Sequence, residues 1–436
     1  MRKLLYICED YVPPVHDGSG VVYLACLQAL EERYEIYAVM FGDPARVTSK
    51  TNDALNALCK AHLILPAVLK NPVVQLARTL ARAFTGQLAA PRLLEEFGRQ
   101  PIHRQIAEFV RRHEPDALYL HKLSCLVRVG EEVVANFPGV KIVDLHDDPV
   151  AREQAERETL DALIRRYPKL GLHHSYARAR WRRRLSRFSP RAARRQEIEL
   201  LSHFDWLYSA SEDEAGHYRR YFEHRVVSCP WPISLTLQPI KAAAAPKYSA
   251  GFIASEAVFN LDGLMAFVET QLPLVRERDP GFTLALAGGV CEVFSRACPD
   301  YAKLGIDLVG PVKDVADFYA SVPVVVVPLL RGTGVSLKTL EALAYRVPVV
   351  STPVGVRGIS LKTLANRDIE IVELAVFYQA LTRRRKPRPS AFGVGGREDL
   401  GQYLDHVASM IEAGSQGSPE RETVRPPAVG ADASRL

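Results

Sequence analysis

Short apolar runs alternate along this chain with segments whose apolar residues recur at helical spacing. The runs are rich in β-branched residues, a pattern typical of strands buried on both faces of a parallel sheet. Such strands are predicted at residues 3–8, 36–41, 114–121, 140–145, 204–209, 248–255, 282–287, 306–309, 322–327 and 347–351. Because helical segments separate these strands in both halves, the pattern predicts an α/β protein with doubly wound parallel sheets.

The helical segments suggest where the domains begin and end. Helices are predicted at residues 21–34, 176–200, 259–275, 335–345 and 399–411, while residues 42–114 have a variable, mostly helical pattern. The stretch 233–247 is rich in Ala and Pro, as domain linkers are. We therefore expect a first domain over residues 1–233, a linker over 234–247, and a second domain over 248–412 whose last helix returns to the first. Residues 413–436 have the composition of a disordered tail.

One stretch, residues 322–358, combines two strands, a glycine turn and a helix. The turn is Arg331-Gly-Thr-Gly334, and the helix after it carries Lys338 and Glu341 on one face. Free amides at a helix start and the positive end of its dipole bind anions. Lys338 adds a charge for a phosphate, and Glu341 can accept hydrogen bonds from a ribose diol. The alternative is a plain turn followed by an ordinary surface pair of Lys338 and Glu341.

The amino-acid sequence of this stretch resembles the donor-binding segment of family-4 glycosyltransferases. The resemblance rests on P-L-L-R-G-T-G-V-S-L-K-T-L-E-A-L-A, from Pro328 to Ala344, followed by P-V-V-S-T-P-V-G-V-R-G up to Gly358. Members of that family are retaining enzymes of the GT-B fold, in which two Rossmann-like domains face each other across a cleft. The resemblance implies a nucleotide-diphosphate sugar as donor and a glycan, a lipid-linked molecule or a small molecule as acceptor.

The same resemblance implies a donor site in the second domain. Its residues are Arg331, Gly332, Thr333, Gly334, Val335, Ser336, Lys338 and Glu341, with Gly310 and Val312 near the base. Two departures stand out. Thr333 occupies the place of a glutamate that contacts the sugar in many relatives, and residues 254–258 lack the Arg and Lys that often hold the diphosphate. Lys338 is therefore expected to carry more of that charge.

In the first domain, candidate residues follow the ends of predicted strands. Gly18 and Gly20 lie in a loop that faces the cleft in relatives, although the third glycine of a dinucleotide fingerprint is missing. The P-D-x-x-x-x-H pattern ends at His121, which the resemblance points toward the donor sugar. His146 and Asp147 follow the next strand. Asp144, Asp147 and Asp148 alone are weak evidence for a metal, and we expect no metal and no cofactor.

Composition and charge limit which localisation and which binding partners we expect. The chain has a net charge of +6, no apolar run long enough for a membrane span, and seven scattered cysteines, so we expect a cytoplasmic protein without disulfides. Nine arginines lie between Arg178 and Arg195, with no acidic residue from 162 to 196. They suggest peripheral contact with an anionic membrane or a solvated helix face. Nucleic-acid binding is not expected, because aromatic interleaving is sparse. An inactive GT-B scaffold in glycan assembly remains an alternative.

Overall fold

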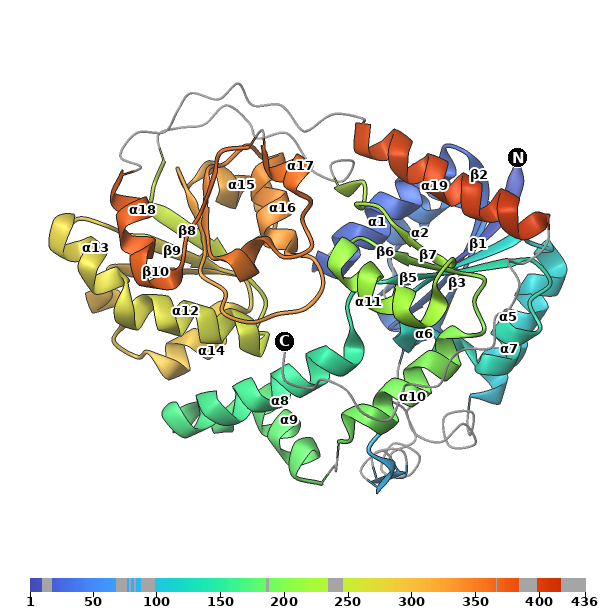
Figure 1. The fold of residues 1–436 in the computed structure, drawn as a ribbon, viewed down its shortest axis with the longest axis horizontal. Helices are drawn as coiled ribbons and strands as arrows, with labels where there is room; N and C mark the ends of the chain where they lie inside the picture. The colour runs from blue at the N-terminus through green and yellow to red at the C-terminus, as the bar shows by residue number, and fades with distance from the viewer. Residues whose placement is uncertain are drawn as a thin grey trace.

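The protein forms two α/β domains that lie side by side (Figure 1). The computed structural model describes residues 1–9, 18–67, 77, 80–81, 84–87, 99–185, 188–233, 246–365, 367–383 and 398–416. The expected linker and tail fall almost entirely outside these ranges, as do residues 384–388 of a second basic run. Each domain is built on one parallel sheet, as the apolar runs predicted.

The first sheet has seven parallel strands in the order β3-β2-β1-β4-β5-β6-β7. Its strands are β1 Arg2–Cys8, β2 Tyr34–Gly42, β3 Ala61–Pro66, β4 Ala117–His121, β5 Val140–Leu145, β6 Trp206–Ser209 and β7 Val226–Ser228. The helices of this domain are α1 Gly18–Glu31, η1 Pro44–Arg46, α2 Ser49–Leu58, α5 Gln100–His113, α6 Leu123–Val129, α7 Glu131–Ala135, α10 Pro190–Leu201 and α11 Glu212–Phe222. Strands β4 and β5 are buried along their whole length, because apolar clusters cover both faces.

The second sheet has six parallel strands in the order β10-β9-β8-β11-β12-β13. They are β8 Ala250–Ile253, β9 Leu284–Ala287, β10 Ile306–Gly310, β11 Val325–Val327, β12 Val349–Ser351 and β13 Ile369–Ile371. Its helices are α12 Val258–Thr270, α13 Leu272–Arg278, α14 Val290–Ala297, η4 Tyr301–Leu304, α15 Val315–Ala320, α16 Leu337–Ala344, η5 Pro353–Val356, α17 Leu361–Ala365, η6 Leu374–Val376 and α18 Phe377–Arg383.

Both sheets reverse their strand order at one place. The reversal lies between β1 and β4 in the first sheet and between β8 and β11 in the second. Ligands of doubly wound proteins bind beyond the carboxyl ends of the strands at such a point. Helix α1 follows β1, His121 is the last residue of β4, and the glycine turn follows β11. Topology therefore places predicted site residues where the fold favours a ligand.

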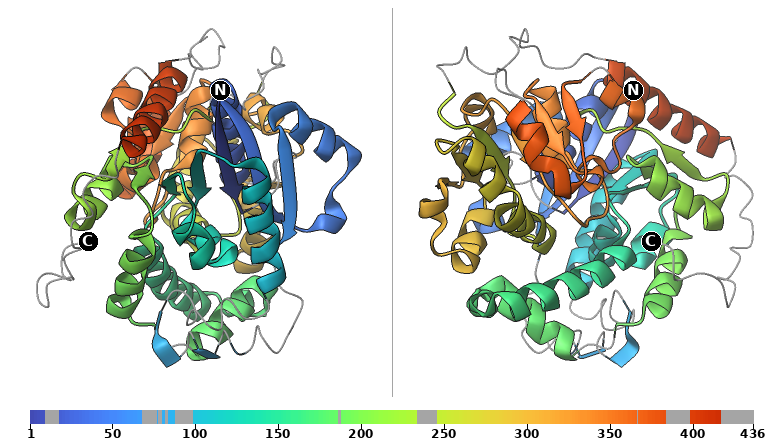
Figure 2. Two further views of the ribbon diagram at one scale, coloured as in Figure 1. Left: turned by 90° about the vertical axis from the view of Figure 1, so that its right-hand side faces the viewer. Right: turned by 60° about the vertical axis from the view of Figure 1, so that its left-hand side comes forward.

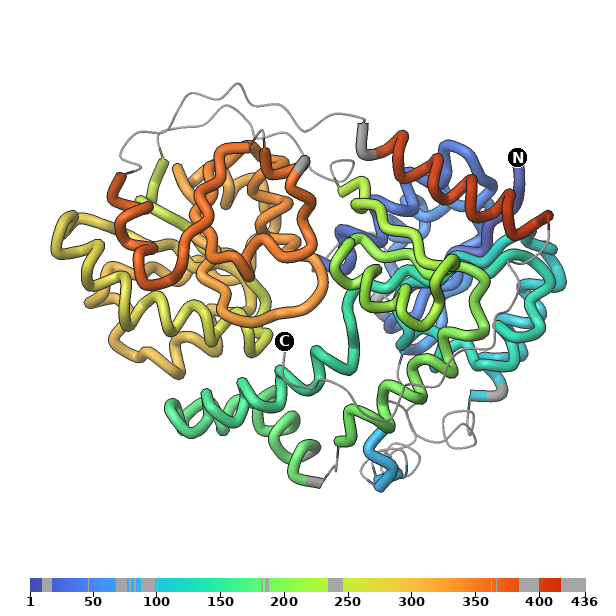
Figure 3. The backbone as a smooth tube through the Cα atoms, viewed as in Figure 1, coloured from blue at the N-terminus to red at the C-terminus, as the bar shows by residue number. Residues whose placement is uncertain are grey.

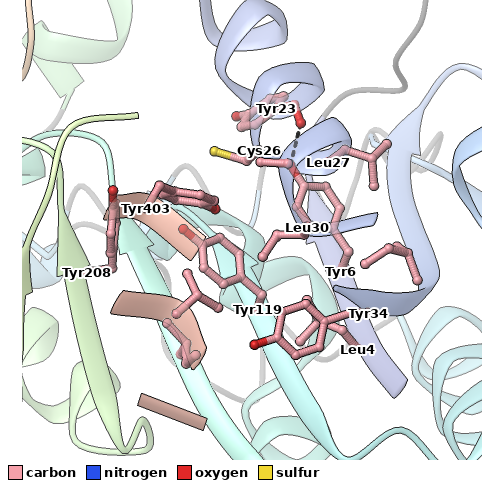
Figure 4. Close-up of a cluster of buried hydrophobic side chains, with 14 of the residues drawn as sticks. Leu4, Tyr6, Tyr23, Cys26, Leu27, Leu30, Tyr34, Tyr119, Tyr208 and Tyr403 are labelled. Atoms are coloured by element: carbon pink, nitrogen blue, oxygen red, sulfur yellow. Dashed lines mark hydrogen bonds between the residues drawn. The ribbon is translucent and has the colours of Figure 1, made fainter. Parts of the chain in front are cut away.

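The last helix, α19 Glu398–Ser415, packs on the first domain, at the other end of the molecule from α18 (Figure 1). Tyr403, Leu404 and Val407 are buried in the same apolar cluster as the β1 side chains. Figure 4 shows Tyr403 beside Tyr119 and Tyr208, and the Tyr6 hydroxyl donating to the carbonyl of Tyr23 at 2.7 Å. The chain thus crosses from the second domain back to the first.

A helical arm crosses in the other direction. It consists of α8 Pro149–Arg166, η2 Pro168–Leu172 and α9 His174–Leu185, which lie along the lower side of the second domain (Figures 1 and 2). Leu160, Leu163 and Leu170 are buried with side chains of α12 and α14. The expected first domain of residues 1–233 is therefore wrong for this segment. The apolar stripe of α8 recurs at helical spacing, but only tertiary packing decides which domain it covers.

Several expected elements differ in extent. Strand β3 lies in a region predicted to be mostly helical, at a sheet edge where all of its side chains except Leu65 are only half-buried. The arginine-rich helix is two helices, because Ser189 caps a new helix at Pro190. The helix expected over 259–275 breaks at Gln271, and Asn260 lies inside α12 instead of capping it. All seven cysteines lie in described residues, and none of them forms a disulfide there. Among the described residues, no helix is both long and apolar enough to cross a membrane.

Candidate active site

The glycine turn after β11 faces the first domain, and Figure 3 shows these orange loops on the side nearest to it. Gly334 has a φ of 69°, and a β-carbon there would lie 2.6 Å from the carbonyl oxygen of His146 and 3.1 Å from the β-carbon of Asp147. A β-carbon on Gly18 would lie 2.9 Å from Leu337. The start of α16 therefore opens onto the start of α1 and the segment after β5.

Lys338 lies in the first turn of α16. Its ammonium group donates to the side-chain oxygen of Asn260 at 3.0 Å. Burial, reinforced by the nearby Arg357 guanidinium, lowers the pKa of Lys338 to about 7, against a small opposing effect of Glu341. A buried amine without an anionic partner is unfavourable when charged. An arriving diphosphate would supply that partner.

Glu341 is 8% exposed and lies one turn deeper on the same helix. It accepts a hydrogen bond from the Tyr319 hydroxyl at 3.0 Å, and the Tyr319 ring stacks on Tyr345 with the ring centres 4.9 Å apart. Burial raises the pKa of Glu341 to about 7. Lys338 and Glu341 thus have separate partners, which a solvated surface pair would not need. The partners of the half-buried Lys338 and the buried Glu341 favour a binding role over the plain alternative.

The basic residue at the turn is Arg357, whereas the sequence pointed to Arg331. The Arg331 guanidinium donates to the Thr159 hydroxyl of α8 at 3.2 Å, so it fastens the arm. Arg357 donates to the carbonyl of Thr333 at 2.8 Å, and a β-carbon on Gly332 would lie 2.7 Å from its guanidinium carbon. Burial lowers the pKa of Arg357 to about 10. The sequence feature that could have identified Arg357 is its position in the P-V-G-V-R-G segment, which ends at Gly358.

A carboxylate already occupies the turn. One oxygen of Glu214, on α11, accepts from the amide of Gly334 at 2.7 Å and from the amide of Asp148 at 3.3 Å. Burial raises the pKa of Glu214 to about 7. Ser211 caps α11, and the carboxylate of Glu214, in the first turn of that helix, reaches across the domain gap. The Gly334 amide is therefore aimed at an anion, and the Ser336 amide donates to the carbonyl of Arg357.

His121 does not face the gap as expected. It is fully buried among the rings of Tyr6, Tyr23 and Tyr119. Its Nδ1 lies 3.0 Å from Nε2 of His146, so it is placed to orient His146 and not to touch a donor. The difference from the expected orientation of His121 has a physical reason. Alternation along a strand fixes which face a side chain takes, but the aromatic layer above β4 was not visible in the sequence.

His146 and the aspartates around it have different tasks. Burial lowers the pKa of His146, as does the nearby Lys122. The Asp144 carboxylate accepts from Tyr119 at 3.0 Å, and Asp148 caps α8, while Asp147 accepts from Arg152 at 2.9 Å. The three carboxylates therefore have separate partners and do not converge on one ion.

The remaining predicted site residues lie on several different elements. Gly310 is the last residue of β10 and Val312 follows it, and β9 and β8 separate β10 from β11. Ser19, between Gly18 and Gly20 at the start of α1, accepts a hydrogen bond from Lys122 at 2.9 Å. Val335 packs against the apolar cluster of the first domain. Among the arginines, Arg183 and Arg194 are paired with carboxylates, whereas Arg178, Arg184, Arg191 and Arg195 are exposed.

The chain is similar in sequence to known proteins over part of its length. Residues 248–370 match the family model of glycosyl transferases group 1, which confirms the resemblance for the second domain. A protein of Klebsiella pneumoniae, named "Uncharacterized 44.6 kDa protein in cps region", is 31% identical over 169 residues. That match covers 37% of this chain and spans less than half, 42%, of the relative.

Solved structures match nearly the whole chain. Anabaena Alr3699/HepE in complex with UDP and glucose has a TM-score of 0.54 at 13% identity and covers 97% of each chain. A glycosyltransferase from Rickettsia africae has a TM-score of 0.52 at 11% identity, with 94% and 93% covered. S. aureus MnaA with UDP has a TM-score of 0.51 at 11% identity, with 94% and 97% covered. At such identities the likeness shows the fold alone. The chain has the GT-B fold, as expected.

Proposed function

We propose that this protein is a retaining glycosyltransferase that moves a sugar from a nucleotide-diphosphate sugar to an acceptor hydroxyl. The observation that carries the proposal is the start of α16, where a half-buried Lys338 and a buried Glu341 lie beside a glycine turn whose amide binds a carboxylate from the opposite domain. The group 1 match over residues 248–370 covers the same residues. Uracil is the first base to test, since Alr3699/HepE and MnaA were solved with UDP.

Charge on the departing diphosphate is the main demand of such a transfer. Preorganised donors that need no reorganisation during the reaction meet that demand best. We assign this task to the Gly334 amide, the Lys338 ammonium and the Arg357 guanidinium. The Glu214 carboxylate must leave Gly334 when the donor binds, because two anions cannot share one amide.

The remaining groups would hold the rest of the donor. Glu341 would accept hydrogen bonds from the ribose, and His146 and Asp147 would face the sugar from the first domain. His121 acts behind His146 as a positioning residue. With Thr333 in place of the usual glutamate, we expect the change to affect which sugar is accepted more than whether transfer occurs. No step of this reaction is assigned to a metal.

The acceptor is proposed to be a glycan, a lipid-linked molecule or a small molecule, in polysaccharide or other glycoconjugate synthesis. The exposed arginines of α9 and α10 offer contact with an anionic membrane surface. Peripheral attachment at the cytoplasmic face would fit such an acceptor. Salt-sensitive binding to anionic vesicles, with no binding to neutral ones, would support this part of the proposal.

The experiment has two stages. A thermal-shift screen with UDP, GDP, ADP, dTDP and their sugars identifies the donor, because a ligand that binds only the folded state raises the melting temperature. Transfer is then measured with that donor, and NMR of the product reports whether the anomeric configuration is retained. Lys338→Ala and Glu341→Ala should abolish transfer with the fold intact. Lys303→Ala, an exposed lysine of the same domain, is the matched control.

Three other results of these experiments would contradict the proposal or favour a different function. No shift with any nucleotide sugar would refute the proposal. Donor binding without transfer or hydrolysis would favour the inactive scaffold, for which the occupied Gly334 amide is the relevant observation. A sugar isomerised while still attached to its nucleotide would indicate an epimerase, since a UDP-N-acetylglucosamine 2-epimerase also matches the fold, with a TM-score of 0.50.

A further inference from the structure

A histidine-carboxylate cluster lies where the helical arm meets the second domain. His173, between η2 and α9, is fully buried. Its Nε2 lies 3.2 Å from a carboxylate oxygen of Glu292 on α14 and 3.7 Å from one of Glu256, in the loop after β8. His174 is adjacent and exposed. One ligand atom from each of His173, His174 and Glu292 lies within 4.8 Å of the other two.

The buried imidazole lacks the partners that such a group normally has. Among the described residues, neither ring nitrogen of His173 has a hydrogen bond with acceptable geometry. Burying a polar group without a hydrogen bond is costly, so most buried polar groups are paired. An ion pair with Glu292 alone would require a charged imidazole in a fully buried place. A bound cation would satisfy the ring in its neutral form.

The donor set identifies the kind of cation. Two imidazoles with carboxylate oxygens are typical ligands of Zn²⁺ and related transition metals, whereas Mg²⁺ and Ca²⁺ prefer oxygen alone. Zinc–ligand bonds of about 2.0–2.2 Å place neighbouring ligand atoms roughly 3.4 Å apart. The ligand atoms lie within 4.8 Å of one another, and His174 and Glu292 are exposed, so binding would require these two side chains to move closer. Their exposure also provides a path for the ion to enter.

The surrounding bonds already orient one carboxylate. The Ser175 hydroxyl donates to Glu256 at 2.8 Å, and the Tyr176 hydroxyl donates to the Glu256 carbonyl at 2.9 Å. Partners of this kind fix the ligands of metal sites. The loop that carries Glu256 also reaches the donor site, because Asn260 donates to the Ser255 carbonyl at 3.1 Å and accepts from Lys338.

We propose that His173, His174 and Glu292, with Glu256 as fourth ligand, bind one divalent transition-metal ion, with Zn²⁺ the best match. The ion fastens the arm to α14 and to the loop after β8. It is a structural site, and it differs from the expectation that the protein binds no metal. The proposal does not depend on the sugar-transfer function, because its ligands lie outside the α16 site and its readouts need no donor.

The test uses the full chain without a histidine tag. After chelation and dialysis, the protein is titrated with Zn²⁺ by calorimetry and with Co²⁺ by visible absorption, and its melting temperature is measured with and without Zn²⁺. We expect one ion per chain, a rise in melting temperature, and the absorption bands of cobalt bound to nitrogen and oxygen ligands. His174→Ala and Glu292→Gln, both at exposed positions, should each weaken binding by at least about tenfold. His224→Ala, an exposed histidine of the first domain, should bind like wild type.

The opposite results would overturn the proposal. Absence of a bound ion would leave His173 and Glu292 as a simple ion pair. Unchanged affinity in both His174→Ala and Glu292→Gln would show that the ion binds elsewhere. Because these two variants alter exposed side chains, a loss of binding with unchanged circular dichroism is not explained by unfolding.

Discussion

Lys338→Met should remove the alkaline limit on donor binding. The Lys338 ammonium is buried, donates to Asn260, and has a pKa lowered to about 7 by burial and by Arg357. A diphosphate binds the charged form, so above pH 7 the free protein must take up a proton before or during binding. The charged form is present below the lowered pKa and is lost above it, which sets the sign of the effect.

The magnitude follows from that pKa. One pKa unit corresponds to about 1.36 kcal/mol, so donor affinity should fall about tenfold at pH 8 and about a hundredfold at pH 9. A hydrogen bond to a charged group contributes about 1.5–3 kcal/mol. Below pH 7, Lys338→Met should therefore weaken donor binding by roughly 10- to 150-fold. Above pH 7 the affinity of this variant should no longer change with pH.

Calorimetric titration of a nucleotide-diphosphate sugar measures both effects. The sugar ester is suitable because it lacks the terminal phosphate proton that titrates near pH 6. Wild type should take up protons at pH 8, seen as a dependence of the binding enthalpy on the buffer, and Lys338→Met should not. Lys303→Met controls for loss of an exposed charge. An equal alkaline slope in wild type and Lys338→Met would refute the assignment of the diphosphate charge to Lys338.

Three further predictions concern the site and the fold. Burial raises the pKa of Glu341 to about 7, so its charged form is lost below that pH. Glu341→Gln should therefore abolish the loss of donor binding at acid pH and should reduce kcat/KM. If the variant still lost donor binding at acid pH, the ribose role of Glu341 would be contradicted. Gly334→Ala should lower the melting temperature and donor affinity, because its β-carbon meets His146; Gly310→Ala has the same backbone strain with no atom within 4 Å, so equal losses of melting temperature would refute the interdomain contact. Arg194→Met leaves the buried Glu197 carboxylate without its cationic partner, with only the Tyr218 hydroxyl donating to it, and should lower the free energy of unfolding by about 3–5 kcal/mol in chemical denaturation. Arg191→Met on the same helix should change it little, and equal effects would exclude a buried pair.

The sequence did not predict strand β3, which lies at the edge of the first sheet. Strand β3 has one buried side chain, Leu65, and the others are half-buried, so the strand lacks the continuous burial of β5. The arm was likewise assigned to the domain that precedes it in sequence. Its apolar stripe predicted a helix with one buried face, but the partners of that face come from residues more than a hundred positions away.

The sequence by itself determined the parallel strands, the glycine turn and the shared face of Lys338 and Glu341, because each depends on residues within two or three turns of one another. The choice of Arg357 over Arg331, the burial of His121 behind His146 and the reach of Glu214 to Gly334 were decided only by tertiary structure. These features depend on which side chains meet across distant segments. Local periodicity fixes the face on which a residue lies, whereas packing fixes what that face contacts.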